Sequence, residues 1–388
     1  MSKWKKVRLG DVCDTNIATL SSKTDFIIDY IDISSVDNEK KEIISYKTYS
    51  SDEAPSRAKL LIKKHDVLVS TVRPNLNAVA LVSTETSNRM VASTGFCILR
   101  SNDLLDCNYL FHYTKSNTFI RKLMSVAKGA SYPAVSNSDV YGTLIPLPPL
   151  DIQKKIAREL DTVSELLKLR KQQLEELDQL TKSVFYEMFG DPVRNEKGWE
   201  VKKVESICIN IFGGGTPSKK VKEYYEGDIP WVTPKDMKSY WITDSEDHIN
   251  ELAITISSTR LVPSRSLLMV VRSGILKHTL PVAINLREVA INQDLKAFVF
   301  RDDVSVIYML YLFKMIEKFL LKGVRSVTAD NIEFNSIKGL SVPVPPTYEQ
   351  SKFADIVTQI ESQKALVKKA IDETQLLFDS LMSKYFDD

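Results

Sequence analysis

One stretch, residues 151–189, constrains the fold of this chain more than any other. It contains no Pro or Gly, and its apolar residues recur in alternating steps of four and three. That spacing averages about 3.5 residues, so it predicts a long helix whose apolar stripe packs on a partner helix in a left-handed supercoil. At 1.5 Å per residue the helix would be roughly 57 Å long. The stripe consists of Ile156, Leu160, Val163, Leu167, Leu174, Leu177, Val184 and Met188.

The chain supplies the partner helix itself, because the same pattern returns 197 residues later, in residues 348–386. Ile156 corresponds to Phe353 and Met188 to Tyr385, and the preceding PLPPLDIQKK becomes PVPPTYEQSK. Thr347 and Gln350 have the spacing of a capping box for the second helix. We expect the two helices to pack antiparallel, although two matching amphipathic helices are also common in simple bundles.

The segments before the two helices repeat as well. The residues from Trp4 to Cys13 match those from Trp199 to Cys208 at a constant offset of 195. The whole chain is therefore a tandem duplication of a unit of nearly 200 residues. We divide it into a globular domain at 1–150, a helix at 151–191, a second globular domain at 192–346 and a second helix at 347–388.

Each globular segment shows strand-like runs followed by a helical pattern, which predicts two similar α+β domains. Arg73 and Arg272, 199 residues apart, each end a buried-looking strand and begin a polar loop, so we align them. The expected strands are residues 26–33, 66–72, 78–82 and 96–99, then 266–271, 282–285 and 297–300, and the expected helices are 104–124 and 304–321.

Charge and composition are ordinary, with a net charge of +2 and 43% hydrophobic residues. Residues 1–150 carry 19 Lys and Arg against 15 Asp and Glu, and residues 192–346 carry 21 against 18. Both globular domains are thus mildly basic, which fits partial contact with a phosphate backbone. No signal peptide or membrane span is expected, so we expect a cytoplasmic protein with reduced cysteines.

No catalytic constellation stands out. Neither Pro-Pro pair has the Asn or Asp that a methyltransferase uses to hold a flipped base. The glycines of residues 212–219 lack the spacing of a phosphate-binding loop, and the cysteines and histidines lack metal-ligand spacing. We therefore expect no catalytic centre, no metal and no cofactor.

Two motifs resemble a known family. The block from Pro146 to Pro192, with its Pro-Pro-x-x-x-Gln start and Phe-Gly-Asp-Pro end, resembles the central conserved region of type I restriction-modification specificity (S) subunits. The GGGTPS segment from Gly213, followed by GDIPWV from Gly227, resembles the opening of that family's target-recognition domains. The first copy lacks the GGTPS loop, so the two domains are expected to recognise different sequences.

The resemblance implies a subunit without enzymatic activity. Each globular domain would recognise one half of a bipartite target in double-stranded DNA. The paired helices would set the spacer between the halves and dock two methyltransferase (M) subunits, to which the restriction and motor (R) subunits attach. No membrane contact is implied.

Polar loop residues are the candidates for DNA contact, because Arg and Asn bond base edges and Lys neutralises phosphate. The candidates are Arg73, Asn75, Asn77, Lys128 and Tyr132 in the first copy, and Lys219, Arg272, Lys277, His278 and Arg325 in the second. Ordinary solvated surface is the alternative for each. For the whole chain, the alternatives are a duplicated coiled-coil scaffold that binds proteins rather than DNA, and a self-contained modification enzyme.

Overall fold

The computed structural model describes residues 4–20, 26–322, 325–326 and 330–387. The chain forms two compact units, each described by itself. Unit 1 comprises Met1–Lys171 and Lys369–Asp388, and unit 2 comprises Gln172–Lys368. Each unit therefore contains one globular domain, called the first or second domain below, together with part of each long helix.

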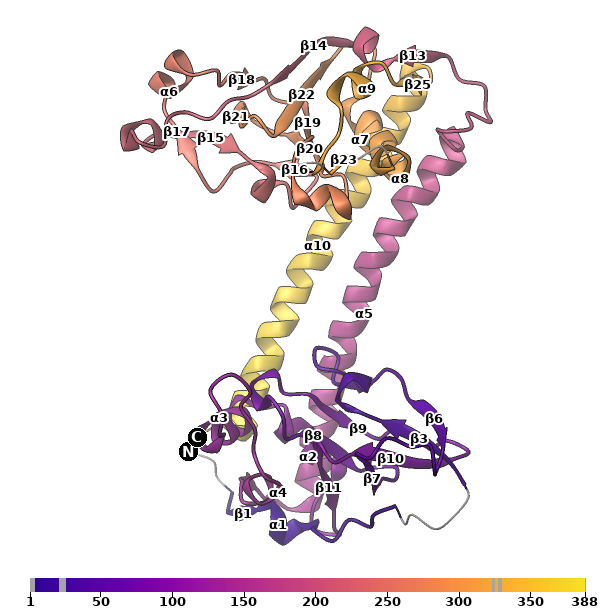
Figure 1. The fold of residues 1–388 in the computed structure, drawn as a ribbon, viewed down its shortest axis with the longest axis vertical. Coiled ribbons are helices and arrows are strands. Elements are labelled where there is room, and N and C mark those ends of the chain that lie inside the picture. Colours follow the sequence, from indigo (N-terminus) through magenta and orange to yellow (C-terminus); the bar gives the residue numbers. More distant parts are fainter. Residues whose placement is uncertain (1–3, 21–25, 323–324, 327–329, 388) are drawn as a thin grey trace. The chain divides into compact units, whose positions relative to one another are not determined.

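The two long helices are α5 (Leu150–Phe189) and α10 (Thr347–Phe386). α5 begins one residue before the expected 151, and it is followed by Gly190, whose φ of 75° suits a residue without a Cβ. In unit 1 the start of α5 packs with the end of α10, because Ile156 and Phe386 share one core. In unit 2, Phe185 of α5 packs on Phe353 of α10. The segments lie side by side and run antiparallel in each unit, as expected (Figure 1).

The first domain has two four-stranded sheets. One has the order β6 (Lys47–Ser50), β3 (Ile27–Ile31), β10 (Arg89–Ser93), β7 (Ala58–Leu61). The other has the order β2 (Cys13–Asp14), β11 (Phe96–Ser101), β8 (Val67–Ser70), β9 (Val79–Leu81). Two smaller pairs are β1 (Lys6–Arg8) with β12 (Leu144–Pro146), and β4 (Val36–Asp37) with β5 (Glu42–Ile43).

The second domain repeats this topology. Its mixed sheet has the order β17 (His248–Ile249), β15 (Ile229–Val232), β21 (Val289–Ile291), β18 (Leu261–Val262). Its antiparallel core has the order β14 (Cys208–Gly213), β22 (Leu295–Phe300), β19 (Leu267–Val270), β20 (Val282–Asn285), with β16 (Trp241–Ile242) added in parallel. β13 (Val201–Lys203) pairs with β25 (Ser341–Pro343), as β1 does with β12. The duplication is therefore present in the fold itself.

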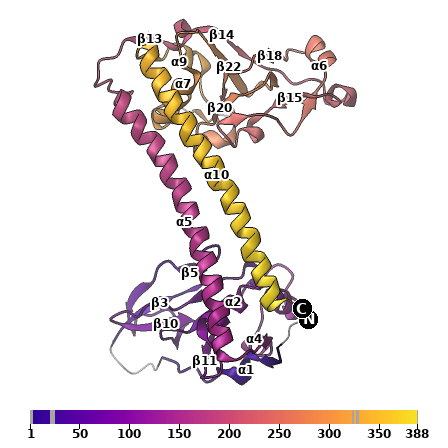
Figure 2. The same cartoon turned by 180° about the vertical axis from the view of Figure 1, so that it is seen from behind.

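Short helices follow the strands, and the two single helices expected there are wrong. Residues 104–124 are divided into α2 (Cys107–Thr114) and α3 (Asn117–Val126), because the Ser116 hydroxyl accepts a hydrogen bond from Phe119 N and caps a new helix. Residues 304–321 are divided at Ile316 into α7 (Val306–Met315) and α8 (Glu317–Leu321). The remaining helices are α1 (Leu9–Val12), α4 (Asn137–Tyr141), α6 (Glu251–Ile256) and α9 (Phe334–Lys338), and Figure 2 shows the same fold from behind.

A buried glutamine joins each long helix to its domain. Gln153 donates from Nε2 to Pro148 O at 2.8 Å and accepts from Asp106 N at 2.9 Å. Gln350 repeats both bonds, to Pro345 O and from Ser305 N, each at 2.7 Å. These bonds satisfy backbone groups at the start of two helices, and they explain the Pro-Pro-x-x-x-Gln spacing.

The expected capping box at Thr347 and Gln350 is wrong. The Gln350 side chain bonds the backbone of Pro345 and Ser305 instead. The Thr347 hydroxyl donates to Asp303 O at 3.2 Å. The side chains of Thr347 and Gln350 thus bond backbone groups next to the N-terminus of α7 instead of capping their own helix.

Candidate nucleic-acid interface

A tight turn follows the buried strand β8 in the first domain. It is a 3-10 turn, η2 (Pro74–Leu76), flanked by Arg73 at φ 51° and Asn77 at φ 47°. Both residues lie in the left-handed region, which costs on the order of 1–3 kcal/mol for a residue with a side chain. Such a conformation persists only where surrounding contacts hold it.

A second loop, residues 128–134, supplies part of that support. Arg73 N donates to Pro133 O at 2.7 Å, and Lys128 and Ala134 exchange backbone hydrogen bonds at 2.9 Å. The Arg73 guanidinium lies 4.6 Å from the centroid of the Tyr132 ring, close enough for a cation–π contact. The two loops therefore bring together four exposed candidates, Arg73, Asn75, Lys128 and Tyr132.

Asn77 is placed differently from these four. It is only 8% exposed, and its carbonyl accepts a hydrogen bond from Lys41 Nζ at 2.6 Å. Burial lowers the pKa of Lys41, and Asp37 partly opposes that effect. Asn77 thus belongs to the support of the turn, together with Lys41. The chain offers no local pattern that would have identified Lys41, because it lies 36 residues away.

The second domain builds the same pair of loops. A 3-10 turn, η6 (Gly274–Lys277), follows β19, and β23 (Arg325–Ser326) pairs with β24 (Asp330–Asn331). Lys277 and His278 are exposed on the first loop. Arg325 pairs through its backbone with Asn331, just as Lys128 pairs with Ala134, but the Arg325 side chain lies outside the described residues.

Strand register corrects the alignment of Arg73 with Arg272. Val67 pairs with Leu99 and Leu267 pairs with Phe298, so β8 and β19 are equivalent at an offset of 200. Val72 bridges to Ala134 and Arg272 bridges to Asn331 in the same way. Arg272 is therefore the counterpart of Val72, and Arg73 is the counterpart of Ser273. The sequence alignment missed this shift of one residue, because polar loops have no periodic pattern that fixes their alignment.

Arg272 is half exposed and paired with a carboxylate. Its Nε donates to Asp294 Oδ1 at 2.6 Å, and Asp294 also accepts from Asn292 Nδ2 at 3.0 Å. Lys219 is exposed in the segment after Pro217, and in the part of unit 2 that the structure describes its side chain forms no hydrogen bond or ion pair with the loop pair. The candidates on the first loop of the second domain are thus Arg272, Lys277 and His278. Arg325 lies on the strand β23, which pairs with β24.

The glycines before Lys219 have a packing role. A Cβ on Gly214 would collide with the carbonyl of Ile291, and one on Gly215 would collide with Ser258. Trp231 Nε1 donates to Gly215 O at 3.1 Å. The glycines allow this segment to approach the neighbouring backbone closely.

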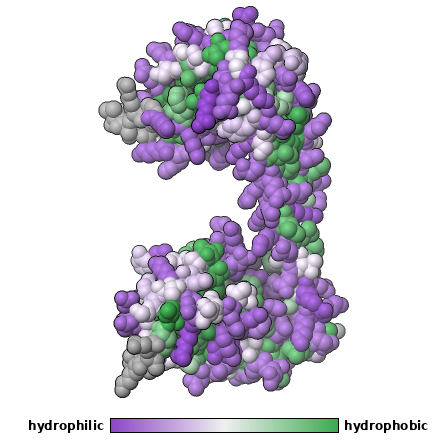
Figure 3. All heavy atoms as spheres, turned by 90° about the vertical axis from the view of Figure 1, so that its right-hand side faces the viewer, coloured by the Kyte–Doolittle hydropathy of each residue, from purple (hydrophilic) through white to green (hydrophobic). Residues whose placement is uncertain are grey.

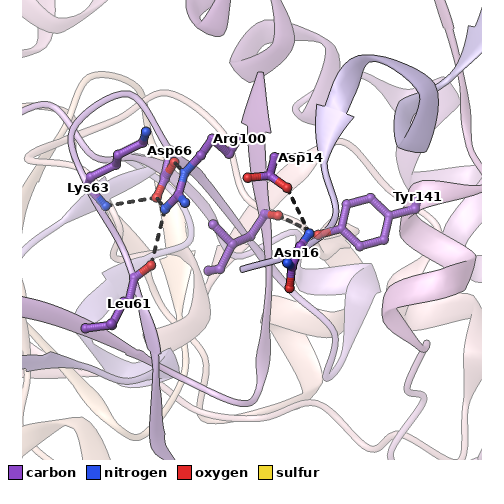
Figure 4. Close-up of polar contacts among 8 residues, drawn as sticks. Asp14, Asn16, Leu61, Lys63, Asp66, Arg100 and Tyr141 are labelled. Atoms are coloured by element: carbon purple, nitrogen blue, oxygen red, sulfur yellow. Dashed lines mark hydrogen bonds and ion pairs between the residues drawn. The ribbon is translucent and has the colours of Figure 1, made fainter. Parts of the chain in front are cut away.

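A buried ion pair supports the sheet that carries the first loop. Arg100 of β11 contacts Asp66 through two bonds, Nε to Oδ1 at 2.8 Å and Nη2 to Oδ2 at 2.7 Å. The same guanidinium donates to Leu61 O, and Lys63 N donates to Asp66 Oδ2 (Figure 4). Asp66 directly precedes β8, so this pair fixes the strand from which Arg73 emerges.

Across the described ranges, no group of three or more His, Cys, Asp or Glu side chains is arranged to hold a metal ion. Nor does the described chain contain a helix that is long and apolar enough to cross a membrane.

Residues 1–179 and 196–375 each match the type I restriction modification DNA specificity domain. The chain belongs to this family. The two matches confirm the duplication and the resemblance seen in the sequence, and they disfavour the protein-binding scaffold. They cover both globular domains and most of both helices.

Named relatives agree with this membership. The chain is 32% identical over 228 residues to the EcoR124I/EcoR124II specificity subunit of Escherichia coli, covering 56% of this chain and 54% of that one. It is 32% identical over 197 residues to the MjaIX specificity subunit of Methanocaldococcus jannaschii, covering 50% of this chain and 44% of that one. The chain thus spans about half the length of these curated relatives.

Solved structures share the fold over nearly the whole chain. One comes from work on complex assembly and conformational transition of a type I R-M system, with a TM-score of 0.65, 27% identity, and coverage of 99% of this chain and 98% of that one. The S subunit from M. genitalium has a TM-score of 0.59 at 14% identity, covering 100% of this chain and 97% of that one, and supports the fold alone.

Proposed function

We propose that this chain is the DNA-recognition subunit of a type I restriction-modification complex, and that each domain recognises one half of a bipartite target. The observation that carries the proposal is the loop pair built at the same place in both domains. The segment after β8 bonds residues 133 and 134 in one domain, and the segment after β19 bridges through Arg272 to Asn331 in the other.

The residues on these loops differ between the domains, as two different half-targets would require. The first domain presents Arg73 stacked on Tyr132, with Asn75 and Lys128 beside them. Arg and Asn suit guanine and adenine edges, and Lys suits phosphate. The second domain has Ser273 in place of Arg73, and Arg272 in place of Val72. The strand order around the loops is the same in both domains, so the different side chains on these loops would alter the target.

We further propose that the functional modules follow the sequence division. Residues 1–150 and 192–346 would recognise DNA, and residues 151–191 and 347–388 would set the spacer and dock two methyltransferase subunits. Hydrophobic side chains left exposed on the helices support docking. The space-filling view shows patches of hydrophobic surface among hydrophilic ones (Figure 3). The exposed leucines along the middle of the two helices are Leu166, Leu169, Leu376 and Leu377 in unit 1, and Leu180 and Leu366 in unit 2.

Catalysis would then lie in the partners, with methylation in the M subunits and cleavage in R subunits attached through them. We place the assembly in the cytoplasm, where its DNA substrate is accessible. The specificity subunits named among the relatives support this division of labour.

Methylation mapping tests the proposal. The chain is purified with its candidate methyltransferase subunit, and methylated sites are mapped on genomic DNA. We expect a bipartite motif with an unrecognised gap. Replacing residues 1–150 by the matching segment of a relative should change one half of the motif, and replacing residues 192–346 should change the other. A stable complex whose methylation follows no motif, or whose two halves change together, would contradict split recognition.

A further inference from the structure

Two lysines of the second domain share one aromatic ring. Lys296 of β22 places Nζ 4.9 Å from the centroid of Phe334, and Lys338 of α9 places Nζ 5.1 Å from the same centroid. Lys296 lies over Gly213 of the neighbouring strand β14, where a Cβ would meet its amine. Phe334 and Lys338 lie four residues apart on α9, whereas Lys296 comes from β22. We call these three side chains the lysine–phenylalanine cluster.

This cluster brings together two lysine side chains, neither of which forms an ion pair with a carboxylate of the described residues. Burial lowers the pKa of Lys296, and the positive charges of Lys338 and Arg272 lower it further. Arg272 has Asp294, but the two lysines have only the ring face, which attracts cations weakly. An arrangement that gathers like charges in this way favours an anion between them.

The first domain lacks every cation of this group. By strand register, Cys97 stands where the second domain has Lys296, and Val72 stands where it has Arg272. α4 and α9 are equivalent, with Tyr141 in the position of Lys338. The Tyr141 hydroxyl instead donates to Ile98 O at 2.9 Å (Figure 4). Three neutral residues of one copy are thus three neighbouring cations in the other.

The cluster also adjoins the proposed DNA-binding loops. Phe334 begins α9 three residues after Asn331, whose backbone bridges to Arg272. Lys296 follows Asp294, the carboxylate that Arg272 contacts, by two residues. The cluster therefore continues the surface on which the second domain would meet its half-target.

We propose that Lys296 and Lys338 bind backbone phosphate of the DNA beside the second half-target, with Phe334 holding both amines in place. This rests on the proposed function. Lysine is a point charge that mostly neutralises phosphate and carries little base information. The first domain has no such contact, so the two half-targets would be held with unequal dependence on salt.

The test measures DNA affinity of the full chain with its methyltransferase partner over a series of salt concentrations. The variants are Lys296→Gln, Lys338→Gln and the double variant. The matched control is Lys203→Gln. Lys203 is an exposed lysine before the start of β14, whereas the cluster lies at Gly213, the last residue of β14. We expect the slope of log affinity against log salt to become shallower by about 0.9 for each cluster lysine removed. The control should keep the wild-type slope, and the methylated motif should stay unchanged in every variant.

Each other outcome has a distinct meaning. If the wild-type complex shows no sequence-specific DNA binding, the proposed function fails and the inference fails with it. If it binds specifically but the double variant keeps the wild-type slope, the phosphate inference alone is overturned. A changed second half of the motif would make the lysines base contacts instead. Loss of methyltransferase association with an unchanged slope would assign the cluster to a protein partner.

Discussion

Removing Arg100 should loosen the first domain and leave the second intact. In the variant Arg100→Met the apolar stem remains, but Asp66, whose side chain is 1% exposed, loses its partner. Only Lys63 N would still donate to that carboxylate. Breaking a buried pair from one side costs about 3–5 kcal/mol, which is a large part of the roughly 5–15 kcal/mol that stabilises a typical domain.

Amide hydrogen exchange, measured on the full chain carrying Arg100→Met, reports on the two domains separately. We expect the amides of β8 and β11 to exchange faster by a factor of about 100 or more, since each 1.4 kcal/mol corresponds to tenfold. The amides of β19 and β22 should keep their wild-type rates. The control is Arg121→Met, because Arg121 is 72% exposed and lies 3.9 Å from Asp387, a surface pair expected to contribute about 0–1 kcal/mol.

The double variant Asp66→Leu with Arg100→Met separates the charge effect from lost packing. Replacing both members of a buried pair with apolar residues is often close to neutral, so exchange in β8 should return toward the wild-type rate. Unchanged exchange in Arg100→Met would refute the assignment of the pair as the support of β8. Equal loosening of β19 would refute the independence of the two domains.

Two further predictions concern the helices. Lys364 contacts Asp178 at 2.5 Å and Glu361 at 2.6 Å, and its side chain is only 8% exposed. Lys364→Met should therefore lower the free energy of unfolding, measured by denaturant titration, by about 1–3 kcal/mol. An unchanged free energy would show that these ion pairs make no net contribution to stability. Burial of His112 lowers its pKa from 6.5 to about 4 despite the contact with Asp161. As the pH falls, His112 therefore becomes protonated in the unfolded chain before it does in the folded chain. The free energy of unfolding should decrease as the pH drops from 6.5 to about 4. His112→Gln should flatten that part of the pH profile, and an equally steep profile would assign it to other groups.

Local patterns predicted the long helices, the duplication and the α+β class. Helical periodicity depends on residues three and four positions apart, and the repeat could be followed at Ile156 and Phe353 without knowing any contact. The pairing of the two helices followed from the apolar stripe, which requires a partner surface. The break at Ser116 was missed because its cap competes with an otherwise continuous helical pattern, and the break at Ile316 has no side-chain cap that could have signalled it.

The candidate site was only partly predictable. Arg73 and Lys128 were chosen as separate polar residues, and their loops meet because Arg73 N bonds to Pro133 O. Lys41, which holds the turn through Asn77, gave no local signal. The loop after Arg272 was misaligned by one residue, since polar loops lack the periodicity that reveals register.

The sequence by itself determined the two helices, the repeat and the family, because these depend on spacing along the chain. Only the tertiary structure decided that Gln153 and Gln350 bond the starts of neighbouring helices, and that Lys296 of β22 lies against Phe334 of α9. The physical reason is that such contacts join strands and helices distant in sequence. Their distances depend on how the sheets pair, and no local pattern of residues records that pairing.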